Sequence, residues 1–306
     1  MGGNTEASTP DLSGKVAIVT GGHTGLGFGT SIELAKHGAR VYIASRLASK
    51  AEEAKNTILE EFPAADVHFL PLDLADLGSI RQAADKFSQH ESVLHILVNN
   101  AGVMCVPYEE TKDGFEMQFA VNYLGHFLLT KLLLPILLET IESVPEGTVR
   151  IVNLSSDGHE KLAPKHGINF SDMNLRNGFS VWARYGHSKL ANVLHSKELA
   201  KRYAKIMSLS LHPGTVRTGL SQGPLSSTPM YRFIKPLVEL GAPGPRKGAK
   251  AIVYAAISTS FNINRDNGAY ILPVGKVSVA SKAARDPSMA QDLWNWSERK
   301  INSLGY

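Results

Sequence analysis

The chain has very little cysteine: Cys105 is the only one among 306 residues. A single cysteine excludes an internal disulfide, so disulfide-stapled secreted folds are excluded and a reducing compartment is expected. The eleven histidines are dispersed, and no cysteine–histidine group has the spacing of a zinc site, so we expect no bound metal. The first twelve residues are polar and do not resemble a signal peptide, which leads us to expect a cytoplasmic protein.

Charge of one sign and long apolar runs are also scarce. The net charge is +4, and lysine and arginine are scattered beside acids, without the basic stripe typical of nucleic-acid binding. The most apolar stretch, 127–141, is interrupted by Lys131, Pro135 and Glu139 and is shorter than a bilayer span. We therefore expect a buried helix there, no transmembrane segment and no nucleic-acid partner.

What the sequence does have is a regular alternation of short apolar runs and amphipathic segments. Runs of the first kind predict strands at 15–20, 40–45, 67–72, 95–100, 149–154 and 206–211, with a candidate seventh at 268–272. Helices are predicted at 28–37, 49–62, 78–90, 115–139, 182–203 and 248–257. This alternation predicts a single α/β domain over 14–306, a Rossmann-type doubly wound parallel sheet, preceded by a flexible tail at 1–13.

The first predicted strand runs directly into a glycine-rich turn, and a predicted helix follows it. A strand, a glycine turn and a helix in this order present a helix N-terminus to a phosphate. Glycine lets the backbone approach that phosphate without a Cβ in the way. A generic glycine loop is the plainer alternative. The cofactor-binding residues predicted here are Gly21, Thr24, Gly25, Leu26 and Gly27.

The end of the second predicted strand carries no acid. In folds of this kind this strand end meets the adenosine ribose, and an acid there would bind the 2′-hydroxyl. Between Arg40 and Lys50 the chain has no aspartate or glutamate. Ser45, Arg46 and Lys50 supply a hydroxyl and cations instead. Because a guanidinium suits a phosphate, the pattern predicts NADP(H) in preference to NAD(H), with an ordinary surface arginine as the alternative.

Polar residues and glycines recur where the predicted strands end. Ligands of parallel sheets bind outside the carboxyl ends of the strands, so these residues are expected to meet around one site. They are Thr20, Ser45, Asp73, Asn99 to Gly102, Ser156 and Pro213.

Tyr185 and Lys189 stand four residues apart in the predicted helix 182–203, which places them on one face. A phenol titrates near pH ~10, and a nearby ammonium lowers its pKa by favouring the phenolate. The pair can therefore act as a general acid/base near neutral pH. As a bare motif it also arises by chance, so its weight depends on the motifs around it.

Taken in order, the motifs resemble those of the short-chain dehydrogenase/reductase family, in its single-domain branch. Ser155-Ser156 and the segments 185–192 and 212–218 look most like the retinol dehydrogenase and WW-domain oxidoreductase group and like fungal reductases of that type. The motifs that carry the resemblance are Thr20-Gly-x-x-x-Gly-x-Gly27, Asp73, Asn99-Asn-Ala-Gly102, Asn122, Ser156, Tyr185-x-x-x-Lys189 and Pro213-Gly-x-Val-x-Thr218.

The resemblance implies an NADP(H)-dependent oxidoreductase and gives each residue a role. Tyr185 would protonate a carbonyl oxygen as the cofactor delivers hydride, and would act as the base in reverse. Lys189 would lower the Tyr185 pKa and hold the nicotinamide ribose. Ser156, or Ser155 if the register is off by one, would bind the substrate oxygen, and Asn122 would hold a water between Lys189 and solvent. Further contacts are implied for Asp73 and Leu74 at the adenine, for Asn100, Ala101 and Gly102 on the adenosine side, and for Pro213, Gly214, Val216 and Thr218 at the carboxamide and phosphates.

Plainer roles stay open for some of these residues. Asn122 could be a structural amide, Asp73 a turn former and Ser156 a helix N-cap. Three histidines near the motifs are expected to be solvated rather than catalytic. They are His159, His166 and His187.

Two segments, 157–184 and 214–246, are expected to cover the pocket and to choose the substrate. The phenylalanine and methionine content of the first predicts a hydrophobic or aromatic ketone, aldehyde or secondary alcohol. Reduction of a C=C bond or a polyphenol ring by the same residues is an alternative, and so is a non-catalytic NADP(H)-sensing protein. Relatives often pair through helices corresponding to 115–139 and 182–203, so a homodimer or homotetramer is considered beside a monomer.

Overall fold

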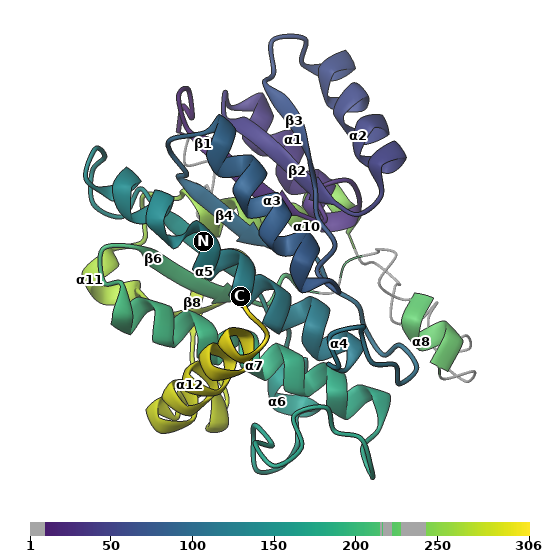
Figure 1. Cartoon of the computed structure of the whole chain (residues 1–306). Helices are drawn as coiled ribbons and strands as arrows, with labels where there is room; N and C mark the ends of the chain where they lie inside the picture. The colour runs from purple at the N-terminus through teal and green to yellow at the C-terminus, as the bar shows by residue number, and fades with distance from the viewer. Residues whose placement is uncertain (1–9, 215, 217–221, 228–242) are drawn as a thin grey trace.

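The computed structural model describes residues 10–214, 216, 222–227 and 243–306, which form one α/β domain around a mostly parallel sheet (Figure 1). The strand order is β3-β2-β1-β4-β5-β6-β7-β8, in which β1 to β7 run parallel and β8 pairs antiparallel with β7. The doubly wound Rossmann-type prediction is therefore confirmed. The strands are β1 (Val16–Thr20), β2 (Arg40–Ser45), β3 (Val67–Pro71), β4 (Ile96–Asn99), β5 (Arg150–Leu154), β6 (Met207–Leu211), β7 (Tyr270–Leu272) and β8 (Lys276–Ser278).

Each central strand divides its side chains between two cores, one on each face of the sheet. In β1, Val16 and Ile18 belong to one core, and Ala17 and Val19 belong to the other. Successive side chains of a strand point to opposite faces, so a strand buried on both faces must be apolar throughout. This explains why the strands appear in the sequence as continuous apolar runs.

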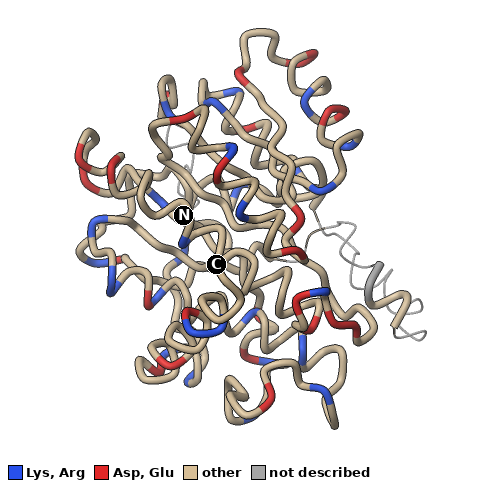
Figure 2. Tube along the Cα trace, viewed as in Figure 1, with Lys and Arg blue, Asp and Glu red and all other residues tan. Residues whose placement is uncertain are grey.

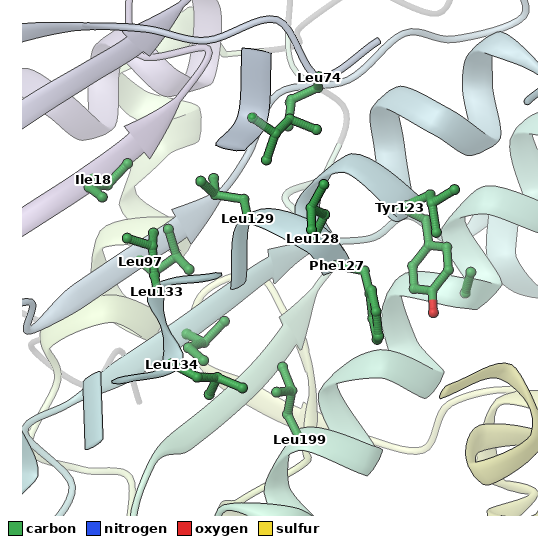
Figure 3. Packing of buried hydrophobic residues seen from close by; sticks show 14 of the residues in the cluster. Ile18, Leu74, Leu97, Tyr123, Phe127, Leu128, Leu129, Leu133, Leu134 and Leu199 are labelled. Atoms are coloured by element: carbon green, nitrogen blue, oxygen red, sulfur yellow. The ribbon is translucent and has the colours of Figure 1, made fainter. Parts of the chain in front are cut away.

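Helices cover both faces. In the core beneath α5 (Gly125–Ile141), Ile18 and Leu97 of the strands lie near Leu129 and Leu133 of the helix (Figure 3). Lys and Arg alternate with Asp and Glu along the outer helices and loops of the described chain (Figure 2). One face carries α1 (Gly25–Lys36), α2 (Ala48–Glu61) and α10 (Pro245–Ile257), and the other carries α3 (Leu77–His90), α5 (Gly125–Ile141) and α7 (Val181–Arg202).

The helix predicted at 115–139 is built in three parts. They are α4 (Met117–Phe119), a π-helical turn η1 (Ala120–Leu124) and α5. Within the described residues this span, Met117–Ile141, is the one helix long and apolar enough to cross a membrane, and 67% of its most apolar window is buried in the domain. The prediction of a buried helix at 127–141 is confirmed.

Boundaries and the C-terminal region differ from the sequence-based expectation. Helix α1 begins at Gly25 rather than at 28, because the motif glycines form its first turn. Of the expected tail, residues 1–9 lie outside the described part, whereas Leu12 is buried and donates its N–H to the His37 carbonyl at 2.8 Å. The elements that the sequence analysis does not predict are β8, α6 (Gly158–Lys161), α8 (Gln222–Ser227), α11 (Ile263–Asp266), η3 (Ala283–Arg285) and α12 (Pro287–Ser303).

Candidate active site

A cavity of about 870 Å³ opens at the carboxyl ends of β1, β2, β3 and β4, and the strand order reverses between β1 and β4. Open α/β sheets bind their ligands at such a point. Residues from four strand ends, far apart in the sequence, meet there. The predicted cofactor residues that line it are Gly21, Thr24, Gly25, Leu26, Ser45, Arg46, Asp73, Leu74, Asn100, Ala101 and Gly102.

The glycine turn fits a phosphate. Gly21 has φ +65° and Gly25 has φ +54°, a left-handed backbone that favours glycine. A Cβ at Gly27 would lie 2.2 Å from the Gly21 carbonyl oxygen, so no larger residue fits there. Thr24 precedes α1 without a side-chain cap, which leaves the first amides of the helix at the cavity without a side-chain acceptor.

Thr20 joins the ends of β1 and β4 beneath this turn. Its Oγ1 accepts from the N–H groups of Asn100 at 2.9 Å and Ala101 at 3.0 Å. The Asn100 Nδ2 donates in return to the Thr20 carbonyl at 2.8 Å. These three bonds hold the segment Asn100 to Gly102 against the glycine turn and explain why the polar residues recur at these two strand ends.

The end of β2 brings cations to the cavity. Ser45 and Arg46 line it as predicted, and His23 from the glycine turn, which the sequence analysis does not select, lines it beside them. Burial lowers the pKa of His23, with smaller contributions from the charges of Arg46 and Lys50. Lys50 is not among the lining residues, because it pairs with Glu53 at 2.7 Å on the exposed face of α2.

Asp73 has the structure of a turn former and also lines the cavity. Its Oδ1 accepts from the Ala75 N–H at 2.9 Å. Both roles considered for it are therefore compatible with the structure.

Tyr185 and Lys189 lie together on α7, both buried. The Lys189 Nζ lies 5.7 Å from the Tyr185 ring centroid and donates to the Leu154 carbonyl at 2.9 Å. Burial lowers the pKa of Lys189 to about 7. Burial also raises the pKa of Tyr185, while a hydrogen bond with Ser156 opposes this rise. The pKa of Tyr185 thus moves opposite to the direction expected, because desolvation disfavours the phenolate in this enclosed position, and the group that opposes the rise is Ser156 rather than Lys189.

The two serines after β5 have different partners. Ser155 is buried and its Oγ donates to the Lys189 carbonyl at 2.8 Å, which fixes α7 to the strand end. Ser156 is half-buried, its Oγ donates to Asp157 Oδ1 at 3.0 Å, and it accepts from the Gly158 N–H at 3.1 Å. Since Ser156 is the serine beside the Tyr185 phenol, the first of the two registers fits the structure.

Asn122 lies in the π-helical turn next to Lys189. Its Oδ1 accepts from the Val103 N–H at 2.8 Å, and its Nδ2 donates to the Val103 carbonyl and to Ser188 Oγ, both at 2.9 Å. A Cβ at Gly102 would lie 3.0 Å from Asn122 Oδ1 and 3.6 Å from Lys189 Nζ. The side-chain amide is therefore structural, as one of the two alternatives for this residue requires, and its main-chain carbonyl is the group left for another role.

The last predicted cofactor contacts follow β6. Gly214 has φ +83°. Val216 packs against α10, where a Cβ at Gly248 would lie 2.6 Å from its methyl groups. Neither these residues nor Pro213 line the cavity. Thr218 lies outside the described residues, as does most of the predicted segment 214–246.

The loop after β4 contributes pocket residues that the sequence analysis misses. Tyr108 lines the cavity, and Arg184 from the predicted segment 157–184 lies over its ring, 4.6 Å from the centroid. On α8, the Ser227 Oγ hydrogen-bonds to the Cys105 carbonyl of the same loop. The apolar character of Met104, Val106 and Pro107 in a strand-end loop is the signal that could have selected it.

Two histidine predictions are wrong. His159 and His187 are buried, 2% and 1% exposed, whereas His166 is exposed as expected. The Nε2 of His159 accepts from the Ser281 N–H at 3.2 Å, its Nδ1 lies 2.6 Å from the Ser156 carbonyl oxygen, and His187 stacks on Phe119, so both histidines join segments of this domain. Within the residues that the structure describes, no group of three or more His, Cys, Asp or Glu could hold a metal ion.

Comparisons with known proteins agree with this geometry. A family model described as short chain dehydrogenase matches residues 15–227. The chain is 46% identical to "Short-chain dehydrogenase/reductase drtF" of Aspergillus calidoustus over 95% of both chains. It is 39% identical to "Retinol dehydrogenase 12" of Mus musculus, over 94% of this chain and 86% of that one. A crystal structure of an uncharacterized protein from Mycobacterium Paratuberculosis superposes with a TM-score of 0.73 at 33% identity, covering 97% and 96% of the two chains.

Proposed function

Because the chain belongs to the short-chain dehydrogenase/reductase family, we propose that this oxidoreductase uses NADP(H) and interconverts a carbonyl and an alcohol on a hydrophobic or aromatic substrate. The observation that carries the proposal is that the buried Tyr185 and Lys189 and the half-buried Ser156 lie together, next to Gly102 of the glycine-turn cavity, where a Cβ would lie 3.6 Å from Lys189 Nζ. Such a group supplies a proton donor and an oxygen-binding hydroxyl next to a dinucleotide site. A cytoplasmic location is part of the proposal, in keeping with a single, buried thiol.

The residues around the phenol suit proton transfer to a substrate oxygen. Burial keeps Tyr185 protonated at neutral pH, so in reduction it acts as the acid and the Ser156 hydroxyl holds the same oxygen. With a pKa of about 7, Lys189 can exchange its proton near neutral pH. The nicotinamide supplies the hydride when bound.

The preference for NADP(H) rests on the end of β2. Ser45, Arg46 and His23 line the cavity where the adenosine ribose is expected, and no acid follows the strand. A guanidinium with a hydroxyl beside it is suited to a 2′-phosphate, whereas the acid that would select a 2′-hydroxyl is missing between Arg40 and Lys50. Glycines 21, 25 and 27 fit the pyrophosphate, since the φ values and the close approach at Gly27 exclude side chains.

The substrate class rests on the pocket wall. Met104, Val106, Pro107, Met117 and the Tyr108 ring give the cavity an apolar side. Such walls select substrates by apolar contact and leave orientation to a few polar groups. Reduction of a C=C bond or a polyphenol ring uses the same residues and is separated by product analysis. A non-catalytic NADP(H) sensor is disfavoured because the four residues expected to be catalytic are all present.

The first test is NADPH oxidation by the purified protein over aromatic ketones, aldehydes, quinones and retinal. Tyr185→Phe is expected to fold and bind NADPH but to lose turnover by roughly 10²–10⁴-fold, the range typical of a general acid. Tyr203→Phe, at the end of the same helix, removes a hydroxyl outside the site and is expected to keep full turnover. Normal turnover by Tyr185→Phe would exclude the proposed mechanism. Tight NADPH binding without turnover on any compound would favour the sensor.

A further inference from the structure

The imidazole of His126 lies between the proposed catalytic residues and the cofactor turns, and none of the proposed roles uses it. His126 stands on α5 and is 1% exposed. Its Nδ1 lies 3.1 Å from the Asn122 carbonyl oxygen, and its Nε2 lies 2.8 Å from Thr20 Oγ1. One side chain therefore joins the turn that carries Asn122 to the strand end that holds Asn100 and Ala101.

The partners of this imidazole fix its tautomer. The Asn122 carbonyl can only accept, so the proton of His126 must be on Nδ1. Burial lowers the pKa of His126 to about 3, and the Lys189 charge acts in the same direction, so the ring is neutral at neutral pH. The other ionisable group that faces it is His195, itself neutral through burial. Nε2 is then unprotonated and can accept. The one proton of the Thr20 hydroxyl has two acceptors within reach, His126 Nε2 at 2.8 Å and the Val98 carbonyl at 3.3 Å, and the shorter contact is the one to Nε2.

A directed hydrogen-bonded chain results. The amides of Asn100 and Ala101 donate to Thr20 Oγ1, and the Thr20 hydroxyl donates to His126 Nε2. The His126 Nδ1–H then donates to the Asn122 carbonyl. Each polar atom along this buried path has a partner, and in a low-dielectric interior such networks hold one geometry.

The carbonyl at the end of this path has an unusual setting. Asn122 lies in the π-helical turn η1, whose i→i+5 pattern departs from the regular helix and is frequent at functional sites. Its side chain is fully used by Val103 and Ser188. The resemblance implies a water between Asn122 and Lys189, and the main-chain carbonyl, which accepts from His126 Nδ1, is the group of Asn122 that remains to hold it.

We propose that His126 is a positioning residue that fixes the Asn122 carbonyl for proton exchange with Lys189 and couples it, through Thr20, to the cofactor-binding segment. This inference rests on the proposed oxidoreductase function. A cofactor that contacts Asn100 to Gly102 would shift the hydrogen bonds that run through Thr20 to His126. Cofactor binding and proton exchange at Lys189 would therefore be linked through one buried side chain.

Two isosteric substitutions separate the two ends of the imidazole. His126→Gln places an amide where Nε2 meets Thr20 and removes the donor to Asn122. His126→Asn places an amide nitrogen near the Nδ1 position and removes the contact with Thr20. The loss of one hydrogen bond of this kind corresponds to roughly a tenfold change. We expect His126→Gln to lower kcat and displace its pH profile with little change in NADPH affinity. We expect His126→Asn to weaken NADPH binding more than it lowers kcat.

The matched control is His195→Gln, which removes another buried imidazole of the same core that has no hydrogen-bonding partner. It is expected to lower Tm without displacing the pH profile. Equal losses of kcat in both His126 variants, with the wild-type pH profile and a parallel fall in Tm, would show a merely structural role and overturn the proposal.

A measurement on the wild-type protein needs no substrate. The ¹⁵N NMR shifts of the His126 ring are expected to show a protonated Nδ1 and a bare Nε2, unchanged between about pH 5 and 8. The opposite tautomer, or titration within this range, would overturn the proposal. Full turnover by Tyr185→Phe would instead refute the proposed function and leave this result intact, so the two failures are distinguishable.

Discussion

Arg46 is the residue on which the cofactor preference depends. Its guanidinium lines the cavity at the end of β2, whereas Lys50 pairs with Glu53 on the outer face of α2. Charge-assisted hydrogen bonds to a phosphate are worth about 1.5–3 kcal/mol, so Arg46→Ala should weaken NADPH binding roughly tenfold or more and leave NADH nearly unchanged. Lys50→Ala is the control and should have the smaller effect. Dissociation constants for both cofactors check this, and equal losses for NADPH and NADH would contradict a 2′-phosphate role.

The site residues that could be predicted from the sequence are those whose role shows in the positions next to them in the chain. The Gly21–Gly27 turn, the spacing of Tyr185 and Lys189, and the missing acid after β2 are all visible in the sequence alone. The contacts of His23 and His126 depend on residues far along the chain, so no spacing reveals them. The same reason explains the wrong prediction for His159, whose partner Ser281 lies on a distant segment.

Arg150 holds two elements together. It stands on β5, is 6% exposed, and donates to the carbonyls of Gly147, Ala255 and Ser258. The last two close the C-terminus of α10, where a cation is favourable. Arg150→Ala leaves these carbonyls unpaired and should lower the free energy of unfolding by about 2–4 kcal/mol.

Urea unfolding of Arg150→Ala beside Lys205→Ala checks this prediction. Lys205 forms an exposed pair with Glu142, so its removal should cost at most about 1 kcal/mol. Equal midpoints for the two variants would show that the carbonyls of α10 find other partners.

Strands and helices with a clear pattern of apolar residues can be predicted from the sequence. Elements that form through contacts with residues far along the chain cannot. The parallel strands and the long helices follow from apolar runs and amphipathic segments. Helix α12 had a usable signal, since Asp286 caps it and Pro287 opens it. The π-helical turn and the short edge strand β8 have no comparable pattern, because the first is set by contacts around Asn122 and the second only by pairing with β7.

The domain contains several histidines that are buried and neutral, and they make its free energy of unfolding depend on pH. Burial lowers the pKa of His126 and His195 to about 3 and that of His187 to about 4, against 6.5 for a free imidazole. At pH values between the folded and the unfolded pKa of these histidines, the unfolded chain binds more protons than the folded chain. The stabilisation is therefore complete above the unfolded pKa of 6.5 and is lost as the pH falls toward the folded values.

Unfolding by urea at about pH 7.5 and about pH 5 should show this loss. His195→Phe removes one of these sites inside an aromatic cluster with Phe127 and Trp294 and should reduce the dependence. His166→Gln, at an exposed position, should leave it unchanged. If His195→Phe kept the wild-type dependence of the free energy of unfolding on pH, buried His195 would not contribute to that dependence.

Helix α12 determines which faces of the molecule are open to a partner. The resemblance to relatives that pair through the helices matching α5 and α7 allows a homodimer or homotetramer. In this chain Trp294 of α12 lies 5.0 Å from the Phe127 ring of α5, and Arg202 of α7 lies over the Trp294 ring. Because α12 already covers α7 and reaches Phe127 of α5, a second copy that packs on this surface would have to displace it. We therefore expect a 33.1 kDa monomer in sedimentation velocity. Trp294→Asp, which loosens α12, should expose the faces and promote self-association, and a wild-type dimer or tetramer would contradict this prediction.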